Sequence, residues 1–361
     1  MISNSQQQEE MGNSTERKSD QIKPCDELDV CDSRYRVVRL LGHGKGGYSY
    51  LAEKDSLFYV LKQIHHEPCD YYAFGDKFEA ECKDYCRLRD AGIRIPEMIL
   101  ADRENERIVK EYIEGNTVFD LVLNDQPTEQ YLPQIREMAE KAKAAGLNID
   151  YFPTNFIVHD GLLWYVDYEC NEYMEEWSFE NWGSRYWSRT PEFEDYLQEH
   201  EKEIRFVPAA LEDASTFSGL RRVVWSTTYR NIYPDEVIDH YDYPGHIQRD
   251  IDRISNVNYH VYLIKEGEIP IGYFYFEHHS NLHIQSLYVL KEYQKKGIGK
   301  KVFAFIRQYC KDNGLDHFTC ECNQHNLNAR QFYEHMGGIN IKENIGHENK
   351  REDQITYSFK I

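Results

Sequence analysis

The run Ile284-Gln285-Ser286-Leu287-Tyr288-Val289 is followed, after four further residues, by Gln294-Lys295-Lys296-Gly297-Ile298-Gly299-Lys300. The first stretch has the composition of a β-strand, and the second leads into an amphipathic helix predicted over residues 298–312. Glycines at 297 and 299 would let the backbone approach a ligand closely, and the first N–H groups of a helix favour an anion. This stretch therefore predicts a strand, a loop suited to a pyrophosphate, and a helix.

Lysines surround this loop more densely than any other part of the chain. They are Lys291, Lys295, Lys296, Lys300 and Lys301. Positive side chains at the start of a helix suit a ligand that carries phosphates. On these residues alone, a lysine-rich loop that merely starts an ordinary helix is the alternative.

The order Gln-x-x-Gly-x-Gly after such a strand resembles the acetyl-CoA signature of the GNAT superfamily of N-acetyltransferases. The stretch from Asn326 to Tyr333, followed by Gly337-Gly338, is similar to that family's Asn-x-x-Ala-x-x-Phe-Tyr helix. Residues 220–237 resemble the first helices of its small-molecule and polyamine-like branch. The resemblance covers 204–361 and implies a GNAT α/β fold with a mixed, mostly antiparallel sheet.

The resemblance also implies roles for individual residues. The backbone of Leu287 and Val289 is expected to pair with the pantetheine arm of acetyl-CoA. Asn326 and Tyr333 are expected near the thioester, with Tyr333 as the general acid for the departing thiolate, which suits a phenol with a pKa of about 10. A tyrosine that only packs in the core is the alternative. The pyrophosphate is expected on Gln294, Lys295, Lys296, Gly297, Ile298, Gly299 and Lys300.

Acetyl transfer to an amine also needs a base or a water relay, because the amine must lose a proton before it attacks. His283 stands where some members of the superfamily have a base glutamate, and an imidazole with a pKa near about 6.5 could accept that proton at neutral pH. An ordinary solvated histidine fits the histidine-rich turn 278–283 equally well. Glu277 and Glu321 are the reserve candidates.

A second glycine-rich stretch, Gly42-His43-Gly44-Lys45-Gly46-Gly47, lies between strand-like runs in the first half of the chain. A dinucleotide-binding loop would open directly into a long helix, whereas this one precedes a strand that carries Lys62. A predicted helix then carries Glu79 and Glu81, and a hinge-like segment follows at 110–115. This order resembles the protein-kinase-like fold.

Three more residues extend that resemblance. Asp150 and Asn155 keep the interval between the catalytic Asp and the metal-binding Asn, and Asp167 stands where Asp-Phe-Gly is expected. The resemblance implies that Gly42, Gly44, Gly47 and Lys62 hold ATP, that Asn155 and Asp167 hold Mg²⁺, and that Asp150 orients the acceptor hydroxyl. Asn148-Ile149 replaces the usual His-Arg, Glu169 replaces the glycine, and no large C-terminal lobe fits before residue 204. The N-terminal half is thus similar to atypical kinases and antibiotic kinases with a reduced C-terminal lobe.

Length and charge agree with two domains in an α+β chain. A chain of 361 residues exceeds the usual size of one core. We predict a disordered tail over 1–33, a minimal kinase-like domain over 34–203 and a GNAT domain over 204–361. Residues 204–361 carry 19 Lys and Arg against 20 Asp and Glu, so almost all of the net charge of -20 lies before them.

That acidic half disfavours nucleic acid as a partner and favours a cation such as a polyamine, with plain solubility as the alternative. The start of the chain resembles no signal peptide, and no stretch is apolar enough to span a membrane, so we expect a cytoplasmic protein. The nine cysteines show no paired spacing and are expected to be reduced.

The sequence thus predicts an enzyme that moves the acetyl group of acetyl-CoA to an amine of a small-molecule acceptor, with a cationic amine as one option. Its companion would be a kinase-like domain that uses ATP and Mg²⁺ if it is active. One alternative is a bifunctional phosphotransferase and acetyltransferase of the antibiotic-modifying type. Another is a nucleotide-sensing regulator whose kinase-like domain does not catalyse.

Overall fold

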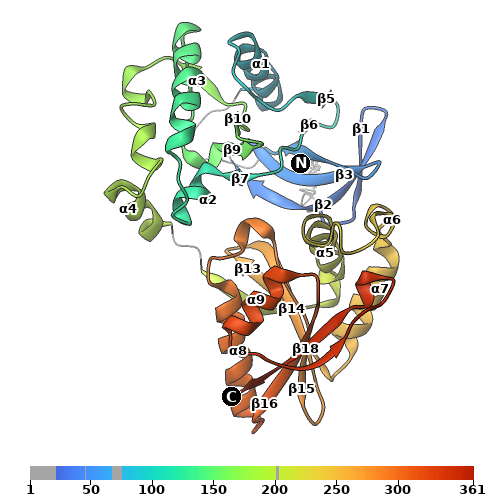
Figure 1. Ribbon diagram of the computed structural model, residues 1–361. Helices are drawn as coiled ribbons and strands as arrows, with labels where there is room; N and C mark the ends of the chain where they lie inside the picture. Colours follow the sequence, from blue (N-terminus) through green and yellow to red (C-terminus); the bar gives the residue numbers. More distant parts are fainter. Residues whose placement is uncertain (1–21, 45, 67–74, 201–202) are drawn as a thin grey trace, which may run out of the picture.

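The computed structural model describes residues 22–44, 46–66, 75–200 and 203–361. Helices and strands are mixed in two domains, as predicted (Figure 1). The seven-stranded sheet of the second domain is mixed and mostly antiparallel, which confirms the predicted fold class. None of the helices within the described ranges is both long and apolar enough to cross a bilayer.

The first domain begins with an antiparallel sheet in the order β1-β2-β3-β4-β6-β5. Helix α1 lies beside it; the Asp76 side chain caps its first turn by accepting from the Glu79 N–H. The bounds are β1 (Glu27–Val30), β2 (Ser33–His43), β3 (Gly47–Lys54), β4 (Leu57–Ile64), α1 (Lys77–Asp90), β5 (Met98–Asp102) and β6 (Arg107–Glu111).

A smaller, mainly helical part follows in the same domain. Its core packs the buried side chains of Ile135, Phe156 and Trp187 around two short sheets, β10-β9-β7 and β11-β8. Its elements are β7 (Asn116–Thr117), α2 (Val118–Leu123), α3 (Leu132–Ala144), β8 (Leu147–Ile149), η2 (Pro153–Asn155), β9 (Phe156–His159), β10 (Leu162–Tyr165), β11 (Cys170–Glu172) and α4 (Pro191–Glu199).

The disordered tail predicted over 1–33 is wrong for its last part. Strand β1 pairs antiparallel with β2, and Val30 is buried. Ion pairs between Arg34 and Asp29 and between Arg36 and Glu27 join the two strands, so a polar segment forms an edge strand with little apolar surface. Residues 1–21 lie outside the described part of the chain.

The sheet of the second domain has the order β12-β13-β14-β15-β16-β18-β17, and only β15 and β16 are parallel. The strands are β12 (Ile204–Pro208), β13 (Tyr259–Glu266), β14 (Ile269–His278), β15 (Leu282–Val289), β16 (His317–Asn323), β17 (Ile339–Asn344) and β18 (Gln354–Lys360). The helices are α5 (Ala214–Thr228), α6 (Asp235–Asp239), α7 (Tyr243–Ser255), α8 (Ile298–Asp312) and α9 (Leu327–His335).

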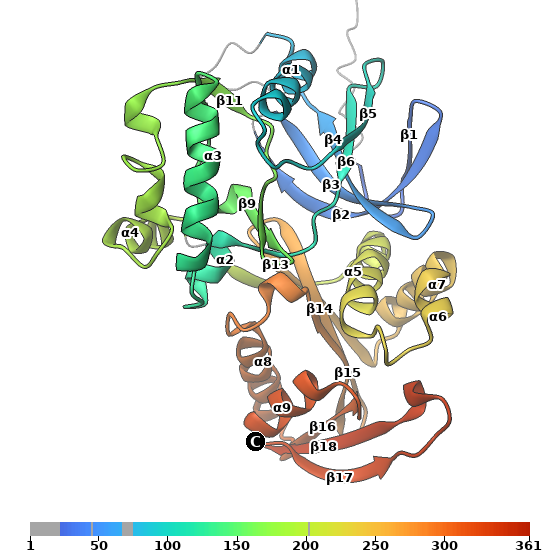
Figure 2. The ribbon, with the colours of Figure 1, turned by 45° about the horizontal axis from the view of Figure 1, so that its top comes forward.

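Helices cover both faces of this sheet (Figure 2). Along β14, Phe274 and Phe276 pack in the cluster that contains α8, while Tyr273 and Tyr275 pack in the cluster that contains α5. Successive side chains of a strand point to opposite faces, so α5 and α8 lie on opposite sides. This arrangement leaves the end of β15 between two helical layers.

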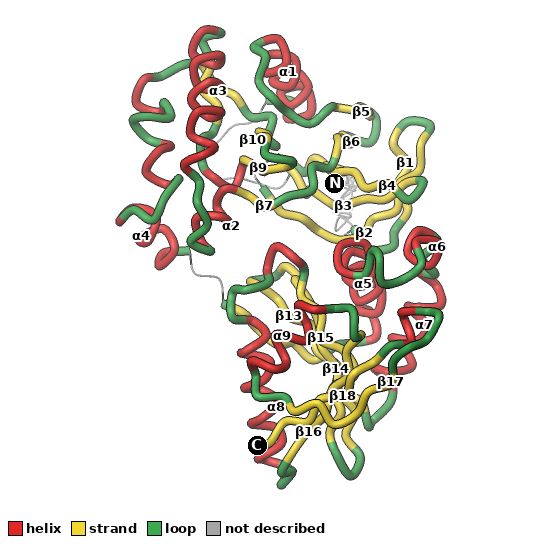
Figure 3. The backbone as a smooth tube through the Cα atoms, viewed as in Figure 1, coloured by secondary structure: helices red, strands yellow, loops and turns green. Residues whose placement is uncertain are grey.

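The two domains share a buried interface where α5 lies against β2 (Figure 3). One apolar cluster contains Val38 from the first domain and Phe217 from the second. A Cβ on Gly219 would come within 2.0 Å of the Val38 carbonyl oxygen, so only glycine lets the helix approach the strand this closely. Close packing therefore helps to set the relative position of the two domains.

Candidate functional site

Within the described part of the chain, no strand pairs with the outer edge of β15 beyond its first residues. β15 pairs with β16 only through Leu282 to Ile284, although it continues to Val289. The Leu290 N–H donates to the Ile271 carbonyl on the side of β14, at 2.9 Å. Since backbone groups alternate along a strand, those of Leu287 and Val289 face the open side, where an extended ligand could pair with them.

The loop after β15 is closed by one of its own side chains. The Gln294 Nε2 atom donates to the Val289 carbonyl oxygen at 2.9 Å. Lys295 and Gly297 both have positive φ, and Gly297 is the N-cap of α8. The first N–H groups of α8 have no partner within the helix, which is the arrangement that suits an anion.

The two glycines of the loop serve different purposes. A Cβ on Gly297 would meet nothing within 4 Å, so its φ of 77° is the reason for glycine there. A Cβ on Gly299 would lie 2.7 Å from the ring of Phe332 in α9. Close approach to a ligand was the expected role of both, but the structure assigns Gly299 to the packing of α8 against α9.

The loop lysines are divided between solvent and the other domain. Lys291, Lys295, Lys300 and Lys301 are exposed. Lys296 instead forms an ion pair with Asp120 in α2, with its Nζ atom 2.7 Å from the Oδ1 atom. No pattern in the sequence predicts this partner, which belongs to the kinase-like half.

Helix α9 contributes Asn326 and Tyr333. The Asn326 side chain caps the helix by accepting from the Ala329 N–H at 3.1 Å. Tyr333 is 7% exposed and packs among the rings of Phe303, Tyr357 and Phe359. Burial raises the pKa of Tyr333 well above its usual value, helped by nearby Cys320, so the phenol keeps its proton at neutral pH.

Further tyrosines gather around Tyr288. Tyr288 of β15 lies beside Tyr229 of α5, with ring centroids 6.2 Å apart, and the Tyr229 ring lies 4.6 Å from that of Tyr233. Burial raises the pKa of Tyr229, of Tyr233 and of Tyr288, so these phenols keep their protons at neutral pH. Tyr288 was not among the predicted site residues, although it stands between Leu287 and Val289.

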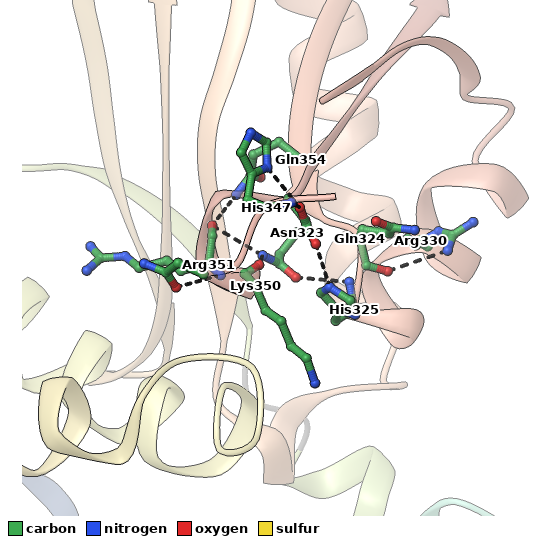
Figure 4. Close-up of polar contacts among 10 residues, drawn as sticks. Asn323, Gln324, His325, Arg330, His347, Lys350, Arg351 and Gln354 are labelled. Atoms are coloured by element: carbon green, nitrogen blue, oxygen red, sulfur yellow. Dashed lines mark hydrogen bonds and ion pairs between the residues drawn. The ribbon is translucent and has the colours of Figure 1, made fainter. Parts of the chain in front are cut away.

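A charged turn reaches this aromatic group from the C-terminal hairpin. In η7 (Lys350–Glu352), the Arg351 guanidinium lies 5.6 Å from the ring centroid of Trp225 and 5.1 Å from that of Tyr233. The turn is held by the Asn323 Nδ2 atom, which donates to the Lys350 carbonyl at 2.7 Å (Figure 4). The Arg351 and Lys350 side chains extend away from that anchor. Arg351 therefore adds a fixed positive charge beside the tyrosines.

His283 lies apart from this group. It is in the part of β15 that still pairs with β16, and its Nδ1 atom shares a hydrogen bond of 2.8 Å with the Thr319 hydroxyl. Burial lowers its pKa, against the opposing charges of Glu321 and Glu277, so the imidazole is neutral at neutral pH. Four residues separate it from Leu287, about 13 Å along a strand at about 3.3 Å per residue. As a base it would need a water relay.

The reserve bases lie at the same end of the sheet. Glu277 accepts hydrogen bonds from His279 and Gln285, and Glu321 accepts one from the Thr356 hydroxyl. In the register, Glu277 stands opposite His283. The structure therefore groups the three candidate bases with one another rather than with Tyr333.

In the kinase-like half, the Lys62 ammonium and the Glu81 carboxylate form an ion pair that is largely shielded from solvent. Glu81 is therefore the partner of Lys62, and Glu79 stands in the first turn of α1, where its N–H is capped. Burial alone would lower the pKa of Lys62, but Glu81 and Asp167 outweigh it and raise the pKa. Lys62 keeps its charge, as a phosphate ligand must.

The glycine-rich turn between β2 and β3 lies over this lysine. The Gly44 N–H donates to the Gly47 carbonyl at 3.0 Å, and Gly42 in β2 pairs with Ser49 of β3. A Cβ on Gly46 would be 3.5 Å from the Lys62 Nζ atom, which places the turn directly above the ammonium. Lys45 lies outside the described residues.

The residues predicted for phosphoryl transfer lie on two neighbouring loops. The Val166 N–H donates to the Asn155 carbonyl at 2.9 Å, which sets Asn155 next to Asp167. The buried Tyr165 hydroxyl accepts from the Asp150 N–H and donates to the Glu169 carbonyl, so it joins both loops. Among the described residues, no group of three or more His, Cys, Asp or Glu side chains is arranged to hold a metal ion.

Lys110 is a buried residue of this site, whereas its position in the sequence predicted only a hinge-like segment. Its Nζ atom donates to the Val166 carbonyl at 2.7 Å and lies 4.3 Å from the centroid of the Tyr168 ring. Burial lowers its pKa. The signal in the sequence was a lysine directly after the apolar pair Ile108-Val109.

Comparisons with known proteins find similar proteins for both halves of the chain. Residues 223–338 match the model of the acetyltransferase (GNAT) family. The N-terminal half is similar to the KEOPS complex subunit Bud32 of Pyrococcus abyssi, 25% identical over 151 residues, which are 38% of this chain and 68% of that protein. It is also similar to the serine/threonine-protein kinase pkn2 of Myxococcus xanthus, 29% identical over 115 residues, which are 31% of this chain and 14% of that one.

Solved structures also match the chain. The PaiA N-acetyltransferase of Thermoplasma acidophilum, in complex with coenzyme A, is 21% identical, with a TM-score of 0.39, and the match covers 44% of this chain and 99% of that one. The microcin C7 self-immunity acetyltransferase MccE, in complex with acetyl-CoA and AMP, is 18% identical, with a TM-score of 0.37, over 44% and 93%. Together with the strand, loop and helices described above, the family match identifies residues 223–338 as a domain of the GNAT acetyltransferase family, joined to a kinase-like N-terminal half.

Proposed function

We propose that the C-terminal domain transfers the acetyl group of acetyl-CoA to an amine of a small molecule. The observation that carries this proposal is the open edge of β15 at Leu287 and Val289, which runs directly into the loop at 294–300. An extended pantetheine arm would pair with that edge. The pyrophosphate would then reach the N–H groups at the start of α8.

The residues around the open edge suit the chemistry of the transfer. Acetyl-CoA supplies a thioester carbon for the amine nitrogen to attack, with loss of the thiolate. Tyr333 would donate its phenolic proton to the sulfur, a role for which its raised pKa keeps it protonated. A neutral His283 would take the proton of the ammonium through ordered water.

The proposed acceptor would bind beside the aromatic group and Arg351. Tyr233 is the partly exposed ring of this group, beside the buried Trp225 and Tyr229, and the positive charge of Arg351 would repel a polycation. An amine that also carries an acidic group therefore fits this wall better than a polyamine does. Incubation of a metabolite extract with isotopically labelled acetyl-CoA, followed by mass spectrometry, identifies the acceptor.

Replacing Gly297 by alanine is expected to weaken acetyl-CoA binding by about tenfold or more, because an L side chain strains the φ of 77° that shapes the loop. Calorimetry on the full chain measures this. Gly314 gives a matched control, since its φ is 68° at the other end of α8 and a Cβ there also meets nothing within 4 Å. Gly314→Ala should leave acetyl-CoA affinity unchanged. Folded wild-type protein that gives no heat of binding would refute the proposed function.

We also propose that the kinase-like domain binds ATP with Mg²⁺, on the observation that Lys62, paired with Glu81, lies under the glycine-rich turn. A thermal shift with Mg²⁺ and ATP is expected in the wild type and should vanish in Asp167→Asn, which removes a metal ligand. Asp160→Asn, at an exposed turn, should keep the shift. No shift in the wild type would favour a scaffold, and phosphate transfer to an added acceptor would favour the bifunctional enzyme.

A further inference from the structure

The loop proposed to hold the pyrophosphate is fastened to the kinase-like domain on both of its sides. At its start, Glu292 of η6 (Lys291–Tyr293) forms an ion pair with Arg39 of β2. In its middle, Lys296 pairs with Asp120 of α2. The two contacts join residues 253 and 176 positions apart in the chain. A loop of one domain is thus held by the other.

The pair of Lys296 with Asp120 is enclosed rather than exposed. The two side chains are 19% and 15% exposed. The second carboxylate oxygen of Asp120 accepts from the Thr117 hydroxyl at 2.7 Å, and the Lys296 ammonium lies 5.1 Å from the centroid of the Tyr293 ring. Water and salt screen such a pair less than an exposed one, so it can hold the loop in one position.

The opposite charges of Lys296 and Asp120 indicate whether the pair binds phosphate or holds the loop. A lysine whose ammonium is bound to a carboxylate adds little net positive charge to a phosphate site, and a free carboxylate there would repel phosphate. The loop keeps four exposed lysines for a ligand without Lys296. The pair therefore serves the geometry of the loop, because backbone N–H groups bind an anion well only when they are held in place.

We propose that Asp120 is a positioning residue for acetyl-CoA binding, so that the kinase-like domain completes the acetyl-CoA site of the other domain. This inference rests on the proposed function of the loop at 294–300. Asp120 acts through Lys296, whose backbone lies between Lys295 and Gly297, the two residues with positive φ. Without the pair, these residues lose the contact that holds the turn against α2.

The same short helix also contacts the kinase-like catalytic loop. Next to Asp120 in α2, the Phe119 ring lies 6.1 Å from that of Phe152. The Phe152 N–H donates to the Asp150 carboxylate at 3.0 Å. Two adjacent residues of α2, Phe119 and Asp120, therefore link the loop at 294–300 to the loop predicted for phosphoryl transfer. Binding at the first loop is expected to steady the second as well, because α2 contacts both loops.

The test measures acetyl-CoA affinity by calorimetry on the full chain. Asp120→Asn and Lys296→Met are each expected to weaken binding by about tenfold, and the double variant should be no weaker than either single one. Asp120→Glu keeps the charge and should retain most of the affinity. Asp125→Asn, in the turn just after the same helix, is the matched control; its side chain is 78% exposed, and the variant should bind like the wild type.

Hydrogen exchange on the wild type provides a second measurement that needs no variant to fold. Acetyl-CoA is expected to slow exchange at residues 116–124 and 150–156 of the kinase-like domain. Unchanged or tighter binding by Asp120→Asn, or unchanged exchange in both segments, would overturn the inference while the proposed function stands. Wild-type protein that binds no acetyl-CoA would overturn both.

Discussion

Replacing Tyr333 by phenylalanine is expected to lower kcat for acetyl transfer by about 100-fold or more, the usual contribution of a general acid. The ring packs against Phe303 and Phe359, and phenylalanine keeps that packing, so acetyl-CoA affinity should change little. The loss of kcat should come from the missing phenolic proton alone. Release of the free thiol of CoA, followed in the presence of the identified acceptor, measures the rate.

Tyr357 is the matched control for this variant. It lies in the same buried cluster, with its ring 5.8 Å from that of Tyr333, and its hydroxyl donates to Glu334 at 3.0 Å. Tyr357→Phe should leave kcat within a few-fold of the wild type. An equal rate in Tyr333→Phe and the wild type would remove Tyr333 from the reaction and leave it as a core residue.

The pH dependence should follow from the same burial. Because the pKa of Tyr333 is raised, its phenol stays protonated as the pH rises through neutrality, and the acid function persists into the alkaline range. Burial lowers the pKa of His283, so its imidazole stays neutral as the pH falls below about 6.5, the ordinary histidine value. Both shifts widen the pH range in which the pair of groups is in its active form.

Replacing Glu53 by alanine is expected to lower the free energy of unfolding by about 3–5 kcal/mol, the cost of leaving one charge of a buried pair uncompensated. Glu53 binds Arg222 across the domain interface, with 3.1 Å between Oε1 and Nε, and also accepts from the Tyr243 hydroxyl at 2.7 Å. The Arg222 side chain is fully buried and would lose its carboxylate partner. Urea denaturation measures the effect.

Two further variants separate this effect from a general loss of charge. Asp29→Ala removes an exposed pair with Arg34 and should change the unfolding free energy little. The double variant Glu53→Gln with Arg222→Met removes both charges and should recover much of the stability, because no buried ion is left alone. A Glu53→Ala protein as stable as the wild type would show that water reaches Arg222.

Most elements of the second domain could be predicted from the sequence. The helix expected over 298–312 is α8, with the same bounds, and the similarity of residues 326–333 to a family helix corresponds to α9. These elements are local, since each follows from spacing and capping within about fifteen residues. The tail over 22–33 was misjudged because its strand depends on pairing with β2 rather than on its own apolar residues.

The candidate site was predicted less completely. The residues on the open edge and the loop were found through their order in the chain, whereas Tyr288, Arg351 and Lys110 were not identified as members of a site. Their importance comes from residues distant in sequence: Arg351 lies over Trp225, 126 positions earlier, and Lys110 binds Val166. No local pattern encodes such neighbours.

The sequence by itself determined the strand, loop and helix at 284–312 and the division into two domains, and it left Glu79 and Glu81 as alternatives in the helix after Lys62. Tertiary structure decided the contacts between them: Lys296 with Asp120, Glu53 with Arg222, and Gly299 against Phe332. The physical reason is the distance along the chain over which each kind of interaction acts. Propensity, capping and glycine conformation act between neighbours in the chain, whereas ion pairing and close packing depend on which surfaces the complete fold brings together.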